Sequence, residues 1–188
     1  MKNYQTTQWL HKFMEEQVQV GDLCIDATMG NGNDTAFLSA LVGNDGRVLA
    51  FDIQEEALVH TKNKLREKGC PDNVQLLLES HERMGNYAEA ESVSCIVFNF
   101  GYLPGGDHSI CTKPDSSIRA VSVGLERLMP GGVMCLCIYS GGDTGYEEKE
   151  ALLTYLKALD QSQYLVIVSE YYNRKNDPPI PVLVYKMK

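Results

Sequence analysis

The chain has 188 residues, enough for one domain with a sizeable core but not comfortably for two. Its hydrophobic fraction of 44% and charged fraction of 22% are ordinary for a globular protein, and its apolar runs are far too short to cross a membrane. The net charge of −8 argues against tight, nonspecific binding of nucleic acid, although a local basic patch could still read a structured RNA.

The predicted elements alternate between helices and strands. An opening helix is predicted over residues 6–18, capped by Thr6 or Thr7, with an apolar stripe that we expect to pack on a sheet. Strands are then predicted at about 22–28, 47–51, 74–78, 93–98, 133–138, 164–172 and 182–187. Helices are predicted at about 34–42, 54–68, 82–90 and 145–160, and from Pro114 to a stop at Pro130-Gly131-Gly132.

This alternation predicts an α/β fold with a doubly wound, seven-stranded and mostly parallel sheet of the Rossmann-like kind. The last two strands have no helix between them, so an antiparallel C-terminal hairpin is predicted at one edge of the sheet. We find neither repeats nor a domain boundary, and we expect a single domain over residues 1–188.

The six cysteines do not predict a metal site. Four of them, Cys24, Cys95, Cys135 and Cys137, lie in apolar strand patterns and are predicted to be small core residues. The sequence has no Cys-x-x-Cys pair, and its four histidines are scattered. The first residues lack the apolar core of a signal peptide, so we expect a cytoplasmic location.

The most informative segment is residues 26–35, which read Asp-Ala-Thr-Met-Gly-Asn-Gly-Asn-Asp-Thr. It predicts a strand, a glycine turn and a helix capped by Asp34 or Thr35, and such turns bring backbone N–H groups close to a ligand. A dinucleotide site would need a third glycine where Thr35 stands, which disfavours NAD. The segment instead resembles motif I of class I S-adenosylmethionine (SAM) methyltransferases, with Thr28 replacing one glycine. A loop that only turns the chain is the alternative.

Ligands bind at the carboxyl ends of the strands in doubly wound sheets, so the residues that follow each strand matter. Asp52 ends the second strand, where a carboxylate can accept both ribose hydroxyls, cap the next helix, or do both. Ser80 and His81 follow the third strand and are expected near an adenine, although His81 could equally be a surface histidine.

The fourth strand is followed by a long glycine-rich segment, residues 99–108, which reads Asn-Phe-Gly-Tyr-Leu-Pro-Gly-Gly-Asp-His. Amino-group methyltransferases carry an Asn/Asp-Pro-Pro-Tyr segment at this place. Asn99 offers a side-chain oxygen that can hold an amine, and Tyr102 offers a face on which a base can stack. A plain connecting loop is the alternative, but a loop of this length at the ligand edge is more often functional.

Taken together, these segments resemble a family of small bacterial class I methyltransferases that was long grouped with the rRNA methylases. Members methylate the amino group of 5-aminomethyl-(2-thio)uridine at the wobble position of tRNA. The resemblance covers nearly the whole chain, and residues 99–108 are its most specific part. The other segments that match the family are residues 26–35, Phe51-Asp52-Ile53-Gln54, Asn173 and Asn176-Asp177-Pro178-Pro179. The chain departs from the family at Asn33 and Gly142, where histidines are frequent.

The resemblance implies SAM as the cofactor and the anticodon arm of tRNA as the substrate. The expected cofactor residues are Asp26, Thr28, Gly30, Asn31, Gly32, Asn33, Asp34, Thr35, Asp52, Gln54, Ser80, His81 and Asn99. The expected catalytic residues are Asn99, Tyr102, Asp107 and His108. An alkylamine is mostly protonated at neutral pH, so a proton acceptor is needed, and Asp107, His108 and Tyr139 are the candidates.

Charges and size bear on the substrate. Arg174 and Lys175 precede two prolines in the loop between the last two strands, and we predict that they contact RNA phosphates. The lysines and arginines of residues 62–68 are expected to form a solvated helix face. A small acidic monomer has little surface for an anticodon arm, which favours a homodimer. The alternative substrates are another RNA, such as rRNA, and a small-molecule amine. A nonenzymatic nucleotide-binding role is a further alternative.

Overall fold

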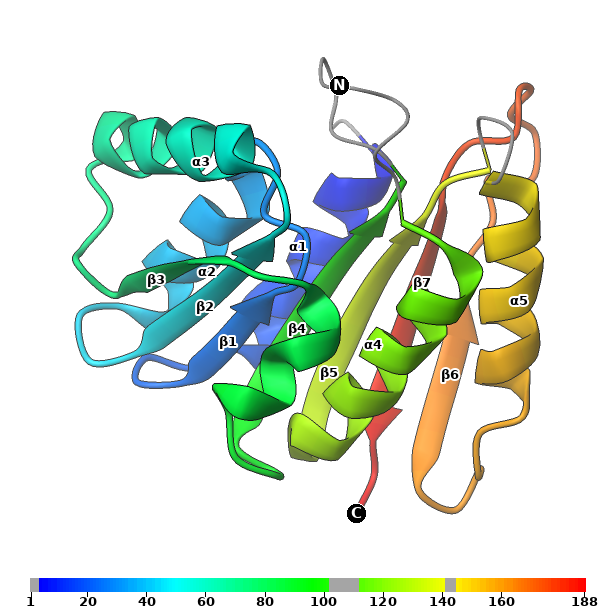
Figure 1. Ribbon diagram of the computed structural model, residues 1–188. Coiled ribbons are helices and arrows are strands. Elements are labelled where there is room, and N and C mark those ends of the chain that lie inside the picture. Colours follow the sequence, from blue (N-terminus) through cyan, green and yellow to red (C-terminus); the bar gives the residue numbers. More distant parts are fainter. Residues whose placement is uncertain (1–3, 102–111, 141–144) are drawn as a thin grey trace.

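The computed structural model describes residues 4–101, 112–140 and 145–188, and within them seven strands form one sheet in the order β3-β2-β1-β4-β5-β7-β6. Figure 1 shows the sheet between helices. The strands are β1 (Leu23–Asp26), β2 (Arg47–Asp52), β3 (Val74–Leu78), β4 (Val93–Phe100), β5 (Leu128–Ile138), β6 (Tyr164–Val168) and β7 (Ile180–Lys186). The helices are α1 (Thr6–Gln17), α2 (Asn33–Val42), α3 (Glu55–Lys68), α4 (Pro114–Arg127), α5 (Gly145–Lys157) and the 3₁₀ helix η1 (His81–Asn86).

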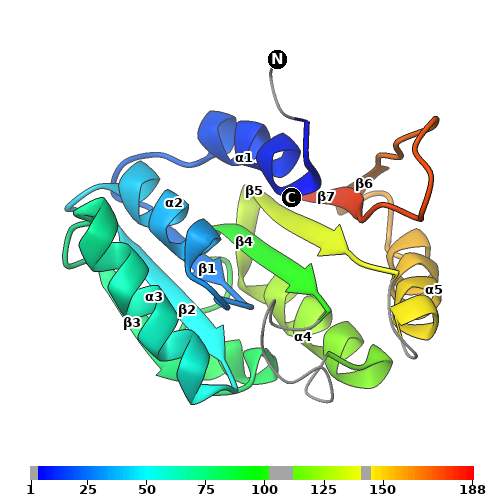
Figure 2. The same ribbon diagram turned by 90° about the horizontal axis from the view of Figure 1, so that it is seen from above.

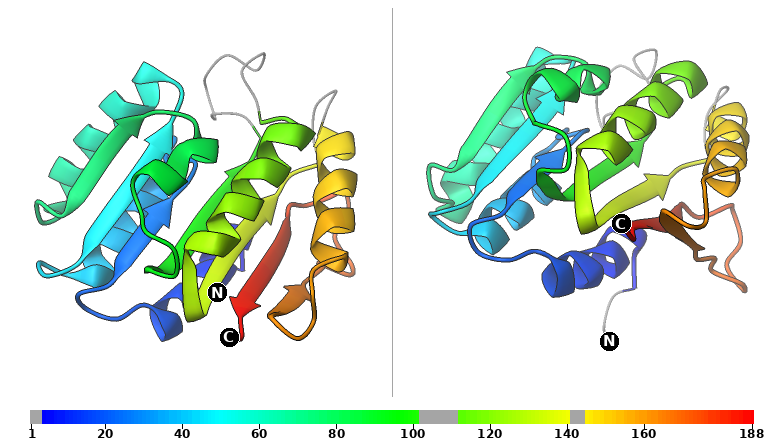
Figure 3. Two further views of the ribbon diagram at one scale, coloured as in Figure 1. Left: turned by 60° about the horizontal axis from the view of Figure 1, so that its bottom comes forward. Right: turned by 90° about the horizontal axis from the view of Figure 1, so that it is seen from below.

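Strands β1 to β5 are parallel, and β7 pairs antiparallel with both β5 and β6. The predicted fold class and C-terminal hairpin are therefore confirmed, with β7 inserted between β5 and the edge strand β6. Seen from below, the chain ends beside the start of β5 (Figure 3). Because β6 runs parallel to β5, the loop between β6 and β7 lies at the edge of the sheet where β1 to β5 end.

The helices cover both faces of the sheet, as a doubly wound fold requires. Viewed from above, α1, α2 and α3 lie on one face, and α4 and α5 lie on the other (Figure 2). Leu10, Met14 and Leu38 of the first group pack on the same cluster as the four predicted core cysteines, which are all buried. The opposite cluster contains Phe51, Phe98 and Phe100 and the inner side of α4 and α5.

Several predicted helix boundaries are wrong, for identifiable reasons. Neither predicted cap of α1 is used: Gln5 precedes the helix, and the Thr6 hydroxyl donates instead to the Pro179 carbonyl at 3.1 Å. The start of α2 follows Gly32 without a side-chain cap, because Asp34 and Thr35 make other hydrogen bonds. The helix predicted over 82–90 is the shorter 3₁₀ helix η1.

Two strand boundaries also differ from the prediction. The helix from Pro114 ends at Arg127, and β5 already begins at Leu128, before the prolyl-glycyl stop. Strand β6 ends at Val168 rather than near residue 172. Its partner β7 begins at Ile180, just after Pro178 and Pro179, and prolines cannot donate the backbone hydrogen bonds that would extend a ladder.

The described residues contain neither a helix that could span a membrane nor a cluster of metal ligands. Every helix in this part of the chain is too short or too polar to cross a bilayer. The same residues contain no group of three His, Cys, Asp or Glu side chains that could hold a metal ion.

Candidate active site

A cavity of about 790 Å³ opens at the carboxyl ends of β1, β2, β3 and β4. Its volume lies within the range typical of sites for small ligands and cofactors. The wall is built by the glycine turn after β1, the segments that follow β2, β3 and β4, the first turns of α1, and Tyr139 after β5. The cavity therefore lies where the strand order reverses, the position at which doubly wound sheets bind ligands.

The carboxylate of Asp52 joins two parts of this wall. The backbone N–H of Gly30 donates to Asp52 Oδ2 at 3.0 Å, and the N–H of Gln54 donates to Asp52 Oδ1 at 3.0 Å. Asp52 thus fixes the glycine turn to the end of β2. A carboxylate has more acceptor sites than these two bonds occupy, so it can also accept from hydroxyl groups of a ligand.

Gly32 is required by packing rather than by a ligand. Its φ is +74°, and a Cβ at this position would lie 2.7 Å from Thr61 Cα on α3. The Thr61 hydroxyl also donates to the Gly30 carbonyl at 3.2 Å. The turn is therefore pressed against α3, which brings α2 and α3 close together and leaves Gly32 off the cavity wall.

Asp26 lies wholly buried behind the wall. It accepts a hydrogen bond from the Thr35 hydroxyl at 2.6 Å and one from the Thr28 N–H at 3.2 Å. Burial, and next the negative charge of Asp34, raise the pKa of Asp26 to about 7. Asp26 therefore orients the turn from inside the protein.

Thr28 replaces one glycine of the motif I pattern, and its side chain makes a structural hydrogen bond. The Thr28 hydroxyl accepts a hydrogen bond from the backbone N–H of Asn99 at 2.7 Å. This bond ties the turn after β1 to the end of β4, the two segments that the sequence singles out.

A chain of hydrogen bonds orients the side chain of Asn99. Its Nδ2 donates to Asp34 Oδ2 at 2.7 Å, and His11 Nε2 donates to Asp34 Oδ1 at 2.6 Å. The His11 ring is stacked on Phe37, with ring centroids 3.8 Å apart. Because one Nδ2 N–H is held by Asp34, the amide orientation is fixed, and Oδ1 is the acceptor that the Asn99 side chain can offer to a ligand.

His81 is half-buried on the opposite side of the cavity. Burial lowers its pKa, so the ring is neutral at pH 7. Its Nδ1 lies 3.3 Å from the Ala27 carbonyl, which can only accept, and therefore Nδ1 carries the proton. The other nitrogen, Nε2, is then an acceptor suited to an exocyclic amino group.

Comparison with known proteins agrees with this geometry. The family described as "Putative rRNA methylase" matches residues 48–185. The chain belongs to this family. It is 37% identical to the Arabidopsis thaliana tRNA (mnm(5)s(2)U34)-methyltransferase, chloroplastic, over 97% of the chain and 69% of that protein.

Solved structures agree as well. The structure of a Clostridium thermocellum protein described as a "putative rRNA-methylase" matches with a TM-score of 0.95 and 44% sequence identity. The match covers 99% of this chain and 100% of that protein. A Streptococcus mutans protein, solved in complex with S-adenosylhomocysteine (SAH), has a TM-score of 0.88 and 37% identity, covering 98% and 99%. These matches show that this chain is a SAM-dependent methyltransferase with the class I fold.

The residues on the wall fit an adenosyl cofactor. Asp52 has carboxylate oxygens of the kind that accept from ribose hydroxyls, and His81 Nε2 is an acceptor suited to an adenine amino group. The Asp34 carboxylate is suited to the positive charges of the methionine part. The shape and the acceptor set of the cavity therefore suit SAM.

Most of the predicted cofactor residues lie on this wall. They are Thr28, Gly30, Asn31, Asn33, Asp34, Asp52, Gln54, Ser80, His81 and Asn99. Asp26, Gly32 and Thr35 do not line it and shape it from behind. The predicted catalytic residues Tyr102, Asp107 and His108, and the departure at Gly142, lie outside the described residues.

Sequence reasoning missed the contribution of α1. The helix packs on the sheet as expected, but its Thr7, Gln8 and His11 also line the cavity. In the described part of the chain α1 comes before the first strand, β1, so a rule based on strand ends could not find these residues. A histidine one position after the apolar stripe residue Leu10 was the available signal, and it is a weak one.

Proposed function

We propose that this methyltransferase methylates the amino group of 5-aminomethyl-(2-thio)uridine at the wobble position of tRNA. The observation that carries the proposal is the bond from Asn99 to Asp34, which leaves an amide oxygen to accept a hydrogen bond from an amine beside the cofactor site. The similarity to a plant enzyme named for this wobble nucleoside supports the choice of substrate.

The work of the protein in this reaction is positioning and exclusion of water. SAM, when bound, supplies an electrophilic methyl group on a sulfonium. Asn99 Oδ1 accepts an N–H of the amine and so directs the nitrogen lone pair, while Asp34 prevents the amide from rotating. Correct placement of two reactants can lower the activation barrier by roughly 7–11 kcal/mol.

Among the residues that the structure describes, we assign proton uptake to His11. The substrate amine must lose a proton to become a nucleophile, much as a lysine must. A neutral His11 that donates from Nε2 to Asp34 keeps Nδ1 as a base, and the Asp34 carboxylate stabilises the cation that forms. Tyr139, which the sequence analysis named as another candidate proton acceptor, lies on the same wall of the cavity.

We also propose that the enzyme is a homodimer that uses β6. Leu165 and Ile167 point to one face of this edge strand and are 47% and 41% exposed. Their neighbours Tyr164 and Val166 pack on the core of the other face. An exposed apolar strip on an edge strand is typical of a surface that pairs with another chain.

The decisive experiment is transfer of labelled methyl groups from SAM into tRNA from a strain that lacks this protein. We expect label in tRNA, and nucleoside analysis should identify 5-methylaminomethyl-(2-thio)uridine. The matched control is tRNA from the parent strain, which should accept little label because its wobble sites are already methylated. Label in rRNA alone, in another tRNA nucleoside, or only in a small amine would overturn the proposal.

A further inference from the structure

A second cavity adjoins the cofactor cavity on the side of α1 and the loop between β6 and β7. Its volume is about 840 Å³, and its wall includes Tyr4, Tyr171, Arg174 and Lys175. Thr7 and Tyr139 line both cavities. A molecule whose reactive group lies beside Asn99 can therefore continue into this second cavity, which we call the outer groove.

Two segments far apart in sequence are joined to form the outer groove. The Tyr171 hydroxyl donates to the Tyr4 carbonyl, and the Thr6 hydroxyl donates to the Pro179 carbonyl at 3.1 Å. On the other side of the loop, the Ser140 hydroxyl donates to the Asp177 carbonyl at 3.1 Å. These bonds fix the loop before any ligand arrives, so little ordering is needed on binding.

The charges of the outer groove are opposite to those of the molecule as a whole. Arg174 and Lys175 are exposed, and the ion pairs found among the described residues use other cations. Lys12 adds a third positive charge, 4.4 Å from the centre of the Tyr4 ring. The nearby carboxylate of Asp177 accepts a hydrogen bond from Tyr146 on α5 at 2.9 Å. On a chain of net charge −8, this is a local cationic patch.

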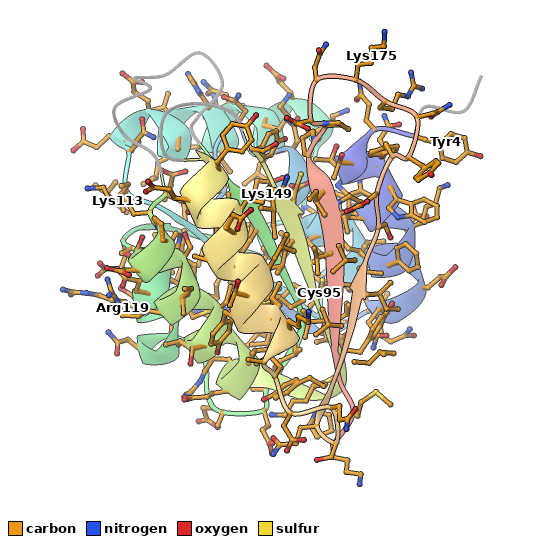
Figure 4. The ribbon with its side chains drawn as sticks, turned by 90° about the vertical axis from the view of Figure 1, so that its right-hand side faces the viewer. Tyr4, Cys95, Lys113, Arg119, Lys149 and Lys175 are labelled. Atoms are coloured by element: carbon orange, nitrogen blue, oxygen red, sulfur yellow. The ribbon has the colours of Figure 1, made fainter. Side chains whose placement is uncertain are left out.

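Aromatic rings accompany these cations. Tyr4, Tyr139 and Tyr171 line the groove, and Tyr172 on the same loop is fully exposed, with a relative exposure of 101%. In Figure 4, Tyr4 lies beside α1 and Lys175 extends from the loop above it. Cations interleaved with exposed aromatic faces are the combination with which proteins hold single-stranded nucleic acid.

We propose that the outer groove binds the single-stranded RNA that flanks the methylated nucleotide, with phosphates on Arg174 and Lys175 and a neighbouring base on Tyr172. This inference rests on the proposed function and adds the surface that recognises the polynucleotide. The wobble nucleotide lies in a single-stranded loop, and such loops present unstacked bases to aromatic side chains.

The first test compares two variants that each lose two positive charges. Arg174→Gln/Lys175→Gln should raise the Kd for an anticodon stem-loop RNA about tenfold, while the Kd for SAM stays unchanged. The slope of log K against log salt should become shallower by about 1.4, because each phosphate contact on a single strand contributes about 0.7. Lys62→Gln/Arg66→Gln on α3 is the matched control and should leave the Kd for RNA and the salt slope at the wild-type values.

The second test uses Tyr172, whose exposed ring can be removed with little risk to folding. Tyr172→Ala should weaken stem-loop binding about five- to tenfold, whereas Tyr172→Phe, which keeps the ring face, should bind as the wild type does. Equal Kd values for the groove variants and the α3 control would overturn the groove assignment. RNA binding needs no turnover, so this result differs from failure of the proposed function, in which the wild type methylates no wobble nucleoside.

Discussion

At the scale of single residues, the orientation of the Asn99 amide is set by side chains that lie far from it in the sequence. Asn99 is found because it follows a strand, yet the amide could present either its oxygen or its nitrogen to the substrate. The choice is made by Asp34, 65 residues away in the chain, and by His11 behind it. Long-range hydrogen bonds of this kind leave no local pattern, so this part of the site could not be predicted.

Asn99→Ala tests the role of the amide oxygen. We expect kcat to fall by about 10²-fold, because a misplaced nucleophile is sufficient for such a loss. Calorimetry should show a nearly unchanged affinity for SAM. Asn33→Ala removes another amide from the same wall and should affect SAM affinity more than kcat. Wild-type turnover in Asn99→Ala would remove Asn99 from the mechanism.

Asp26 should make stability depend on pH. Because burial and Asp34 raise the pKa of Asp26 to about 7, the folded protein keeps a proton that the unfolded chain releases near pH 4. The free energy of unfolding should therefore fall as the pH rises from about 4 to 7, by at most about 1.4 kcal/mol per pH unit from this group. Urea unfolding of the wild type and of Asp26→Asn at pH 5 and pH 8 measures this, and the difference between the two pH values should shrink in the variant. An identical pH dependence would show that Asp26 is not protonated in the folded state.

At the scale of elements, local patterns predict what local interactions decide. The bounds of β3 and the start of α4 follow the sequence, because an apolar run and a proline at the first helical position decide them. The end of β6 depends on the prolines that precede its partner β7, which lie across a hairpin. The predicted caps of α1 and α2 are also decided by distant parts of the chain. Thr6 and Asp34 form hydrogen bonds with distant segments instead of capping these helices.

The contact between the glycine turn and α3 predicts a difference between two glycines. Gly32→Ala should lower the free energy of unfolding by roughly 2–4 kcal/mol, because the left-handed backbone disfavours a Cβ and Thr61 occupies its place. Gly69→Ala is the control, because its φ of +63° is similar but the space around it is open. That variant should lose only about 1 kcal/mol. Urea denaturation measures both, and equal losses would show that the contact with Thr61 is unimportant.

At the scale of the whole molecule, the sheet order explains which parts of the site were predictable. The ends of β1 to β4 meet at one edge in any doubly wound sheet, so the glycine turn, Asp52, His81 and Asn99 could be placed together in advance. Residues 4–6 and the loop between β6 and β7 meet because β7 is inserted beside β5. The outer groove is therefore a product of topology, although its two cations stand out in the sequence.

The apolar strip on β6 predicts the state of assembly. Light scattering should give the wild type a mass of about twice the 21.0 kDa of one chain, because Leu165 and Ile167 are buried when two copies pair. Leu165→Lys/Ile167→Lys should be monomeric, since it places positive charges in that interface. Val20→Lys/Val59→Lys adds the same charges at two other exposed apolar residues and should remain dimeric. Circular dichroism establishes that each variant is folded. A monomeric wild type, or a dimer that survives both lysines on β6, would exclude this strand as the interface.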